Sequence, residues 1–332
     1  MILICFGTRP EYIKIKPIIE KIKGNVPYKL LFTGQHLDLL SNVQEETIRL
    51  SIKDGPNRLD SIVTSVLNKD TPFNSGELSG VKYVLIQGDT SSAFAIALGA
   101  FHKKIKIIHL EAGLRTYNKD DPYPEEFNRQ CISRMADIHL CPTKTAAKNL
   151  IAERVSGKIY VVGNTVLDNL VGIEPTNDNN VVVTMHRREN HDNLDEWFLQ
   201  INNLAKHNKN LNFIIPLHPN PNVQKHAHLL TNLKVINPLE YNDFIALLAS
   251  SKYVVTDSGG LQEESCFFRK PCLVCRKTTE RVEGLGDYSL LCKSPSLLSE
   301  KFEQLKKLKM HGESPYGDGN ASEKIKDILL KL

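Results

Sequence analysis

Short apolar runs recur along this chain, and amphipathic or alanine-rich stretches separate them. Each run is apolar throughout, which is typical of strands that a parallel sheet buries on both faces. In the first half, strands are predicted at 2–6, 28–33, 81–87, 105–110, 137–142 and 158–162. Helices are predicted at 10–22, within 54–80, and at 93–102, 127–135 and 144–153. This alternation predicts a doubly wound α/β domain.

The same pattern restarts after a polar, proline-containing segment, residues 172–180. Further strands are predicted at 181–185, 213–217, 235–236, 253–256, 272–274 and 290–291, and helices at 193–206, 242–250, from 261 onward, and near 296–309 and 321–331. We therefore expect an α/β protein of two Rossmann-like domains whose parallel sheets face a cleft. The expected domains are residues 1–170, completed by a C-terminal helix at about 312–332, and residues 171–311.

Two local features need an interpretation of their own. Pro17 lies inside the first predicted helix, where it should bend the helix or mark a restart. Cys272 and Cys275 have a spacing seen in redox and zinc motifs. They follow Pro271 in an apolar run, and residues three apart on a strand point to opposite faces. We therefore expect neither a metal site nor a disulfide there.

Composition limits the possible partners. The chain has 332 residues, 41% of them hydrophobic and 24% charged, with a net charge of +4, as in ordinary globular proteins. No block of Lys and Arg resembles a nucleic-acid or membrane footprint. No apolar run approaches the roughly 18 residues of a membrane span, and the N-terminus is unlike a signal peptide. We expect a cytoplasmic protein without nucleic-acid or membrane partners.

Ligands of parallel sheets bind beyond the carboxyl ends of the strands. The loops that follow the predicted strands are therefore the candidates for chemistry. They are residues 7–11, 35–36, 88–92, 111–129, 186–190, 218–221, 257–260 and 278–281.

Two of these loops suit an anion. Ser258, Gly259 and Gly260 end a strand and precede a helix, where backbone N–H groups and the helix dipole favour phosphate. A plain helix cap by Ser258 is the equally good alternative. In the first domain, Arg9 and Lys14 take the corresponding place, and Arg binds phosphate bidentately. The chain has no GxGxxG, so a standard dinucleotide site lacks support.

Carboxylates gather on the first-domain loops. Asp89, Glu111 and Glu125 would face the same cleft, and residues 109–129 are unusually charged for a segment beside a buried strand. Without His and Asp at metal-ligand spacing, proton transfer is favoured over metal binding. His186 ends the first strand of the second domain beside two arginines, which favours contact with a ligand over a purely structural role.

In this order, the motifs resemble the non-hydrolysing UDP-N-acetylglucosamine 2-epimerase family over the whole chain. The matching segments are GTRPE (7–11) with Lys14, GQH (34–36), GDT (88–90), HLEAGLRT (109–116), PEEFNR (124–129), GNTVLD (163–168), HRREN (186–190), HPNP (218–221), DSGGLQEE (257–264), TTER (278–281) and PYGDG (315–319). The family fold resembles the two-Rossmann glycosyltransferase type (GT-B), with the last helix packed on the first domain.

The resemblance implies interconversion of UDP-GlcNAc and UDP-ManNAc through elimination of UDP and its re-addition to 2-acetamidoglucal, with neither NAD nor metal. It implies a homodimer that supplies ManNAc-type sugars for surface polysaccharide. The implied catalytic residues are Asp89, Glu111, Glu125 and His186. The implied substrate-binding residues are Arg9, Lys14, Arg129, Phe244, Ser258, Gly259, Gly260, Glu264 and Arg281. The order in which the carboxylates act stays open.

Some positions depart from the family pattern. Met185 stands where Gly is usual before HRREN, and Asn190 is followed by His191 where Gly is common. Leu37 and Asp38 replace the polar pair of members with an allosteric UDP-GlcNAc site, which argues against activation by substrate. The alternatives are a hydrolysing epimerase, an epimerase of a related UDP-2-acetamido sugar, a glycosyltransferase, and a non-catalytic nucleotide-sugar binding module.

Overall fold

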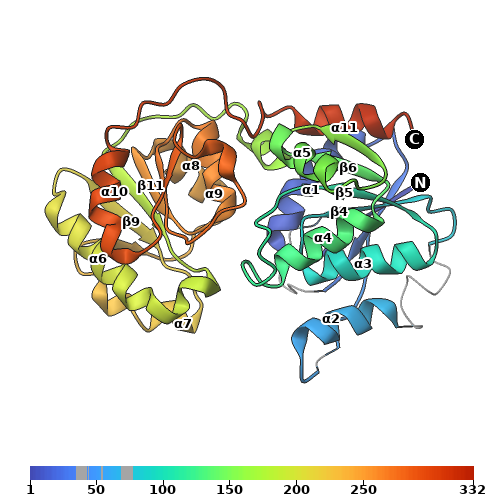
Figure 1. Ribbon diagram of the computed structural model, residues 1–332, viewed down its shortest axis with the longest axis horizontal. Helices are drawn as coiled ribbons and strands as arrows, with labels where there is room; N and C mark the ends of the chain where they lie inside the picture. Colours follow the sequence, from blue (N-terminus) through green and yellow to red (C-terminus); the bar gives the residue numbers. More distant parts are fainter. Residues whose placement is uncertain (35–42, 44, 54, 69–77) are drawn as a thin grey trace. The chain divides into compact units, whose positions relative to one another are not determined.

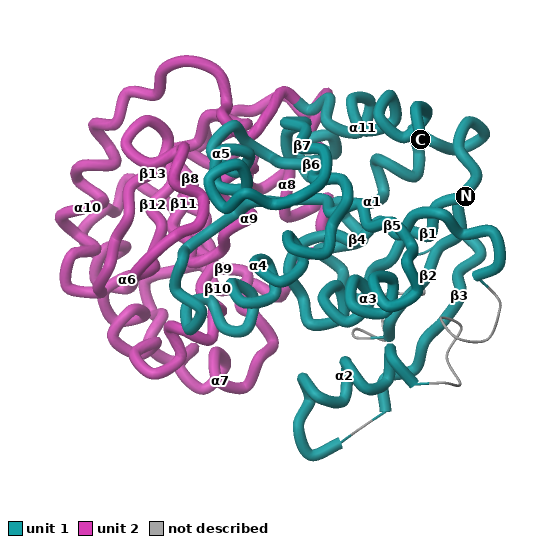
Figure 2. Tube along the Cα trace, turned by 45° about the vertical axis from the view of Figure 1, so that its right-hand side comes forward, with its two compact units in different colours: residues 1–169, 319–332 teal, residues 170–318 magenta. Residues whose placement is uncertain are grey.

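The computed structural model describes residues 1–34, 43, 45–53, 55–68 and 78–332. The chain divides into two compact units (Figure 2). Unit 1 comprises Met1–Asn169 and Gly319–Leu332, and unit 2 comprises Leu170–Asp318. Figure 1 shows helices and strands alternating along both units. In the part of the chain that is described, no helix is both long and apolar enough to cross a membrane.

Unit 1 is built on a seven-stranded sheet in the order β3-β2-β1-β4-β5-β6-β7, with every neighbouring pair parallel. Its strands are β1 (Ile2–Phe6), β2 (Tyr28–Phe32), β3 (Thr47–Arg49), β4 (Tyr83–Gln87), β5 (Lys106–Leu110), β6 (Ile138–Cys141) and β7 (Lys158–Val161). The predicted parallel α/β organisation is confirmed. The prediction missed β3, because its three residues include Thr and Arg at the sheet edge and form no apolar run.

Helices cover both faces of this sheet. They are α1 (Arg9–Ile22), α2 (Arg58–Leu67), α3 (Ser91–His102), α4 (Glu125–Met135), α5 (Lys144–Ala152) and α11 (Ala321–Leu329). One core cluster joins β1 to α1 and α11 through Ile4, Ile15 and Ile325. A second cluster joins the other side chains of β1 to α2 and α3 through Leu3, Val66 and Ile96. Strands apolar on both faces are what this two-sided burial requires.

The crossovers leave β1 and β4 in opposite directions, toward β2 on one side and β5 on the other. The loops after β1 and β4 therefore meet at the topological switch point of the sheet, where open α/β sheets bind ligands.

The predicted restart at Pro17 does not occur, because α1 is one helix from Arg9 to Ile22. Proline has no N–H to donate to the carbonyl four residues earlier, which is that of Ile13. Asn169 Nδ2 donates to the Ile13 carbonyl at 3.0 Å instead. The Asn169 side chain thus supplies the donor that Pro17 lacks, and the Ile13 carbonyl keeps a hydrogen-bond partner.

The C-terminal helix is held in unit 1 by Asp168. The Asp168 carboxylate accepts the backbone N–H groups of Ala321 (3.2 Å) and Ser322 (2.7 Å), together with the Ser322 hydroxyl. These N–H groups belong to the first turn of α11, and N–H groups in a first turn have no hydrogen-bond partner within their own helix. The apolar face of α11, with Ile325 and Leu329, packs into the unit 1 core.

Replacing Asp168 with alanine should therefore destabilise unit 1. Loss of a helix cap costs about 1–2 kcal/mol of unfolding free energy, and chemical denaturation would measure it. Asp168→Asn is the matched control, since its single amide oxygen can still accept from Ser322 and should restore part of the stability. Equal stability of Asp168→Ala and the unchanged protein would show that the cap contributes nothing.

Unit 2 contains a six-stranded parallel sheet in the order β10-β9-β8-β11-β12-β13. Its strands are β8 (Asn180–Thr184), β9 (Asn212–Pro216), β10 (Lys234–Ile236), β11 (Tyr253–Thr256), β12 (Cys272–Val274) and β13 (Ser289–Leu291). Its helices are α6 (Leu194–His207), α7 (Pro221–Gln224), α8 (Tyr241–Ser250), α9 (Gly259–Phe267) and α10 (Leu298–Leu305). Trp197, Phe198, Phe213 and Phe302 are the largest apolar side chains of its core.

Two predicted boundaries shift in unit 2. The helix expected from Leu261 begins at Gly259, so both glycines of the motif form its first turn. The predicted linker, residues 172–180, is bound to unit 2 over its second half. Thr176 and Asp178 donate backbone N–H groups to the carbonyls of Ala249 (3.1 Å) and Ser250 (2.9 Å).

Candidate functional site

Glu111 is the best-defined carboxylate of the predicted site. It directly follows β5, and its backbone adopts φ +65°, a conformation that costs a non-glycine residue energy. Its side chain is almost completely buried, with 7% exposed. Strained, buried ionisable residues beyond a strand end are concentrated at functional sites.

Donors from three separate segments surround this carboxylate. Lys14 Nζ, from α1, lies 2.8 Å from Oε1 and 2.6 Å from Oε2. Gln87, the last residue of β4, donates to Oε2, and Asn164 Nδ2 donates to Oε1 at 3.2 Å. A cation and two amides therefore stabilise the carboxylate charge and hold its orientation.

Lys14 and Glu111 were both predicted as site residues, and the structure brings them together. Gln87 and Asn164 were not predicted. Gln87 is a polar residue that ends an apolar strand, and Asn164 stands in the GNTVLD segment. These signals were present in the sequence, but only the tertiary structure shows that both side chains reach Glu111.

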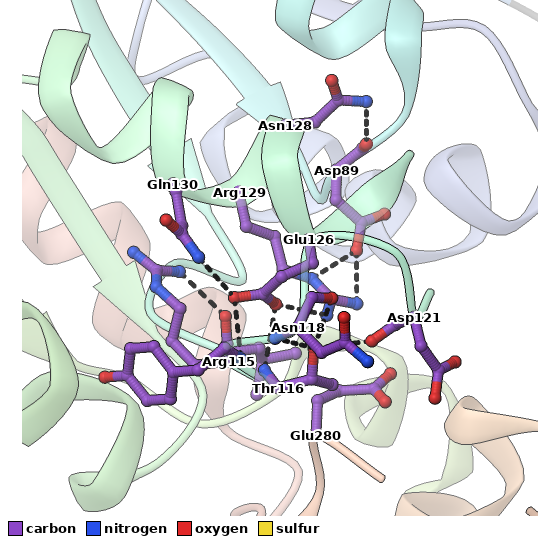
Figure 3. A network of polar contacts seen from close by, with 12 residues as sticks. Asp89, Arg115, Thr116, Asn118, Asp121, Glu126, Asn128, Arg129, Gln130 and Glu280 are labelled. Carbon is purple, nitrogen blue, oxygen red and sulfur yellow. Dashed lines mark hydrogen bonds and ion pairs between the residues drawn. The ribbon is translucent and has the colours of Figure 1, made fainter. Parts of the chain in front are cut away.

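Asp89 and Arg129 form a second cluster in unit 1 (Figure 3). Arg129 places Nε 2.7 Å and Nη2 2.6 Å from Asp89 Oδ2, and the Arg129 side chain is 6% exposed. The Asn128 amide donates to the Asp89 carbonyl at 2.8 Å. Asn128 and Arg129 both belong to α4, so this helix holds Asp89 and the loop that follows β4.

The neighbour of Glu125, Glu126, holds the charged loop before α4 in place. Its fully buried carboxylate accepts the backbone N–H groups of Thr116 (2.9 Å) and Tyr117 (3.1 Å) and contacts Arg129 Nη1 at 3.4 Å (Figure 3). Glu125, the predicted catalytic residue, is half-buried at the first position of α4. The charge concentration that drew attention to residues 109–129 is thus partly structural.

Arg9 begins α1 and is half-buried. Thr8 caps the helix by accepting the backbone N–H of Glu11, and the Glu11 side chain accepts the backbone N–H of Thr8 in return. The cationic side chain therefore stands at a helix N-terminus, where the dipole also favours an anion. Lys16, in contrast, is exposed and faces Glu20 at 3.7 Å, as expected for a solvated helix face.

His109 is a buried residue of β5, two positions before Glu111. Its Nε2 lies 2.8 Å from the Gly88 carbonyl, the residue before Asp89. Burial lowers the pKa of His109 to about 3, compared with about 6.5 in an unfolded chain.

This pKa shift predicts that the folded protein becomes less stable as the pH falls. Below pH 6.5 the unfolded chain binds a proton at His109 and the folded chain does not, so stability falls by about 1.4 kcal/mol per pH unit until about pH 3. Above pH 6.5 His109 is neutral in both the folded and the unfolded chain, so it does not contribute to the pH dependence of stability. Denaturation at pH 7 and pH 5 should show the loss, and His109→Gln should reduce it; an unchanged slope in the variant would contradict the assignment.

In unit 2, the loop after β8 is organised by Asp257. This carboxylate is fully buried, and Oδ2 accepts the backbone N–H groups of His186 (2.9 Å) and Arg187 (2.8 Å) and the Asn190 amide (3.2 Å). The predicted phosphate motif therefore contributes a residue that shapes the neighbouring HRREN loop, a role that the sequence did not reveal.

The His186 side chain is 34% exposed. Its ring stacks on that of His218, with centroids 5.2 Å apart and planes at 10°, and Nδ1 lies 3.5 Å from Asp257 Oδ1. Burial lowers the pKa of His186, although the Asp257 charge opposes the shift. A neutral ring with one N–H is the form that this environment favours near neutral pH.

The predicted phosphate-binding residues, Ser258, Gly259 and Gly260, lie at the start of α9. Within the described part of unit 2, the Ser258 side chain makes no capping hydrogen bond, so the alternative of a plain serine cap has no support from the geometry. A Cβ on Gly259 would lie 2.6 Å from Arg281 Nη1, so a larger residue there would displace the Arg281 guanidinium. At Gly260 an added Cβ would meet none of the described atoms within 4 Å.

Arg281 is held against this turn by two acidic neighbours. Nε donates to Glu263 at 2.6 Å, and Nη1 contacts Glu280. Its guanidinium is therefore oriented at the start of α9 before any ligand binds. Glu264 is buried one turn into the helix and accepts the Tyr241 hydroxyl at 3.4 Å, and Phe244 is half-buried on α8.

The structure thus assembles the predicted residues in three groups. In unit 1, Lys14 contacts Glu111, and Arg129 contacts Asp89. In unit 2, His186, Ser258, Gly259 and Arg281 lie around Asp257 and the start of α9. Gln35, His36, Leu37 and Asp38 lie outside the described residues.

Comparison with known proteins points in one direction. The family model for UDP-N-acetylglucosamine 2-epimerase matches residues 20–330. The UDP-N-acetylglucosamine 2-epimerase of Campylobacter jejuni is 38% identical, over 99% of this chain and 97% of that protein. The corresponding protein of Neisseria meningitidis is 37% identical over 99% of both chains.

Solved structures agree. The UDP-GlcNAc 2-epimerase from Neisseria meningitidis, crystallised with UDP-GlcNAc, superimposes with a TM-score of 0.88 at 34% identity and full coverage of both chains. MurG from Acinetobacter baumannii matches with a TM-score of 0.62 at 10% identity. The second match shows the fold alone, and it supports the GT-B type predicted from the sequence.

Proposed function

This chain belongs to the UDP-N-acetylglucosamine 2-epimerase family, and we propose that it interconverts UDP-GlcNAc and UDP-ManNAc by eliminating UDP and adding it back. The family's activity makes it an isomerase. The observation that carries the elimination mechanism is Glu111, a buried carboxylate in a strained backbone conformation that a cation and two amides hold in place.

Direct deprotonation at C2 is unfavourable because this carbon is not next to a carbonyl. In the elimination, a base removes the C2 proton while the C1–O bond breaks and its electron pair leaves with UDP. The products are 2-acetamidoglucal and UDP. Addition of UDP at C1, with a proton delivered to the opposite face of C2, completes the epimerisation. Two faces require more than one acid or base, and Asp89, Glu111 and Glu125 would supply them.

UDP must stay bound between the two steps, which requires groups that stabilise its charge as it leaves. In unit 2, the backbone N–H groups of Ser258–Gly260 and the side chain of His186 would bind the diphosphate. Arg9 and the oriented Arg281 would add positive charge. Glu264 would accept the ribose hydroxyls, and Phe244 would contact the nucleotide.

Incubation with UDP-GlcNAc in heavy water, followed by proton NMR, tests this proposal. We expect UDP-ManNAc with deuterium at C2 and little free sugar. Free ManNAc would instead indicate a hydrolysing epimerase, and transfer only after addition of an acceptor would indicate a glycosyltransferase. UDP binding without turnover would indicate a binding module. UDP-2-acetamido-6-deoxy and uronic sugars tested in parallel would define the substrate range.

We further propose that the protein is a cytoplasmic homodimer that feeds ManNAc-type sugars into surface polysaccharide. Aromatic side chains on α3 and α4 support an interface in unit 1, since Phe101 is 55% and Phe127 51% exposed. Size-exclusion chromatography with light scattering would give the mass, and Phe127→Glu should shift it toward the monomer. An unchanged mass would argue against this surface.

A further inference from the structure

Glu11 is a buried carboxylate for which the proposed mechanism has no direct use. Its side chain contacts two separate loops of unit 1. Oε2 accepts the backbone N–H groups of Gly7 (2.6 Å) and Thr8 (2.8 Å), and Oε1 accepts the Thr90 hydroxyl at 2.6 Å. The residue is 3% exposed, so it is covered by the protein itself.

The two loops are those of the topological switch point. Gly7 and Thr8 follow β1 and directly precede Arg9, whereas Thr90 follows β4 and comes directly after Asp89. One carboxylate thus bridges the loop that carries a proposed anion-binding arginine and the loop that carries a proposed catalytic carboxylate.

Helix capping explains only half of these contacts. The capping box of α1 requires a single Glu11 oxygen, the one that accepts the N–H groups next to the helix start. The other oxygen reaches a residue 79 positions away. Thr90 in turn accepts the backbone N–H of Ala93 at 3.1 Å, so the same hydroxyl also begins α3.

We propose that Glu11 is a positioning residue that sets Arg9 and Asp89 relative to one another, by joining the β1–α1 and β4–α3 loops through Thr90. This role rests on the proposed function, in which these loops act on the same substrate. A carboxylate suits the task because it accepts on both oxygens at once, which neither glutamine nor an apolar side chain can do.

Removal of the bridge should lower kcat more than it changes KM. Thr90→Val deletes the donor, and Glu11→Leu deletes the acceptor. We expect each to lower kcat by about tenfold or more, the usual cost of one hydrogen bond to a charged group. UDP affinity should fall less than kcat, because Arg9 is only one of several proposed diphosphate groups. Because both remove the same bridge, the double variant should be no slower than the worse single variant. Thr90→Ser keeps the hydroxyl and should retain the wild-type kcat.

Thr143→Val is the matched control. Thr143 caps α5 as Thr90 caps α3, accepting the Ala146 N–H at 3.0 Å. Its loss should lower thermal stability to a similar extent and leave kcat unchanged. If Thr143→Val and Thr90→Val lower kcat equally, or if the two bridge substitutions add independently, the positioning role is wrong.

Amide hydrogen exchange provides a readout that does not depend on turnover. Thr90→Val should speed exchange at Gly7 and Thr8, which are not mutated, and Thr143→Val should not. Inactive wild-type protein would refute the proposed function alone, and the exchange result would still decide whether Glu11 couples the loops. Unaltered exchange at Gly7 and Thr8 would overturn the proposal.

Discussion

Replacement of Glu111 by glutamine is expected to lower C2 exchange and epimerisation by about 10²–10⁴-fold, the usual contribution of a general acid or base. Glutamine keeps the size of the side chain but can neither take nor give the proton. The structure adds a second reason: the new amide group would face Lys14 and Gln87, which are both donors. Deuterium incorporation at C2 by NMR would measure the effect.

The same variant should still bind UDP, because it leaves the proposed diphosphate groups unchanged, both those of unit 2 and Arg9 of unit 1. Calorimetry with UDP separates this outcome from misfolding. Asp120→Asn is the matched control, since it neutralises an exposed carboxylate of the same loop and should leave turnover unchanged. Near-normal turnover of Glu111→Gln would refute its role in proton transfer.

Replacement of Asp257 by alanine is expected to have the largest effect in unit 2. The substitution leaves the N–H groups of His186 and Arg187 without their buried acceptor, whereas the Asn190 amide keeps the Cys275 carbonyl as an acceptor. Each orphaned donor costs about 1–3 kcal/mol, so the free energy of unfolding should fall by about 3 kcal/mol or more. UDP affinity should fall by tenfold or more, because the HRREN loop loses its shape.

Asp257→Asn tests whether the acceptor or the charge matters. Its amide oxygen can replace Oδ2, so this variant should recover most of the stability lost in Asp257→Ala. Urea denaturation and calorimetry with UDP would compare the two. If alanine and asparagine lower UDP affinity equally while both proteins stay folded, then the charge, and not the loop geometry, carries the effect.

The secondary structure was predictable where each element has a strong local signal. The apolar runs of β1, β11 and β12 identified these strands with their observed bounds. The signal failed at β3, whose three edge residues include Thr and Arg, and at Gly259, where the loop of the motif is already helical. The restart that Pro17 suggested does not occur for a tertiary reason, because the Asn169 amide donates to the Ile13 carbonyl from 156 positions away.

Residue types and motif spacing alone identified the family, the α/β class and the carboxylates at strand ends, because these depend on local composition and order. Which side chains meet was decided by the tertiary structure. Gln87 and Asn164 reach Glu111, Asp257 shapes the HRREN loop, and Glu11 bridges the two loops of the switch point. Such contacts join residues far apart in the chain, and no periodicity or propensity encodes them. Of the charged segment 109–129, Glu111 alone combines a strained backbone with a convergent set of donors, whereas Arg115 and Glu126 hold the loop in place.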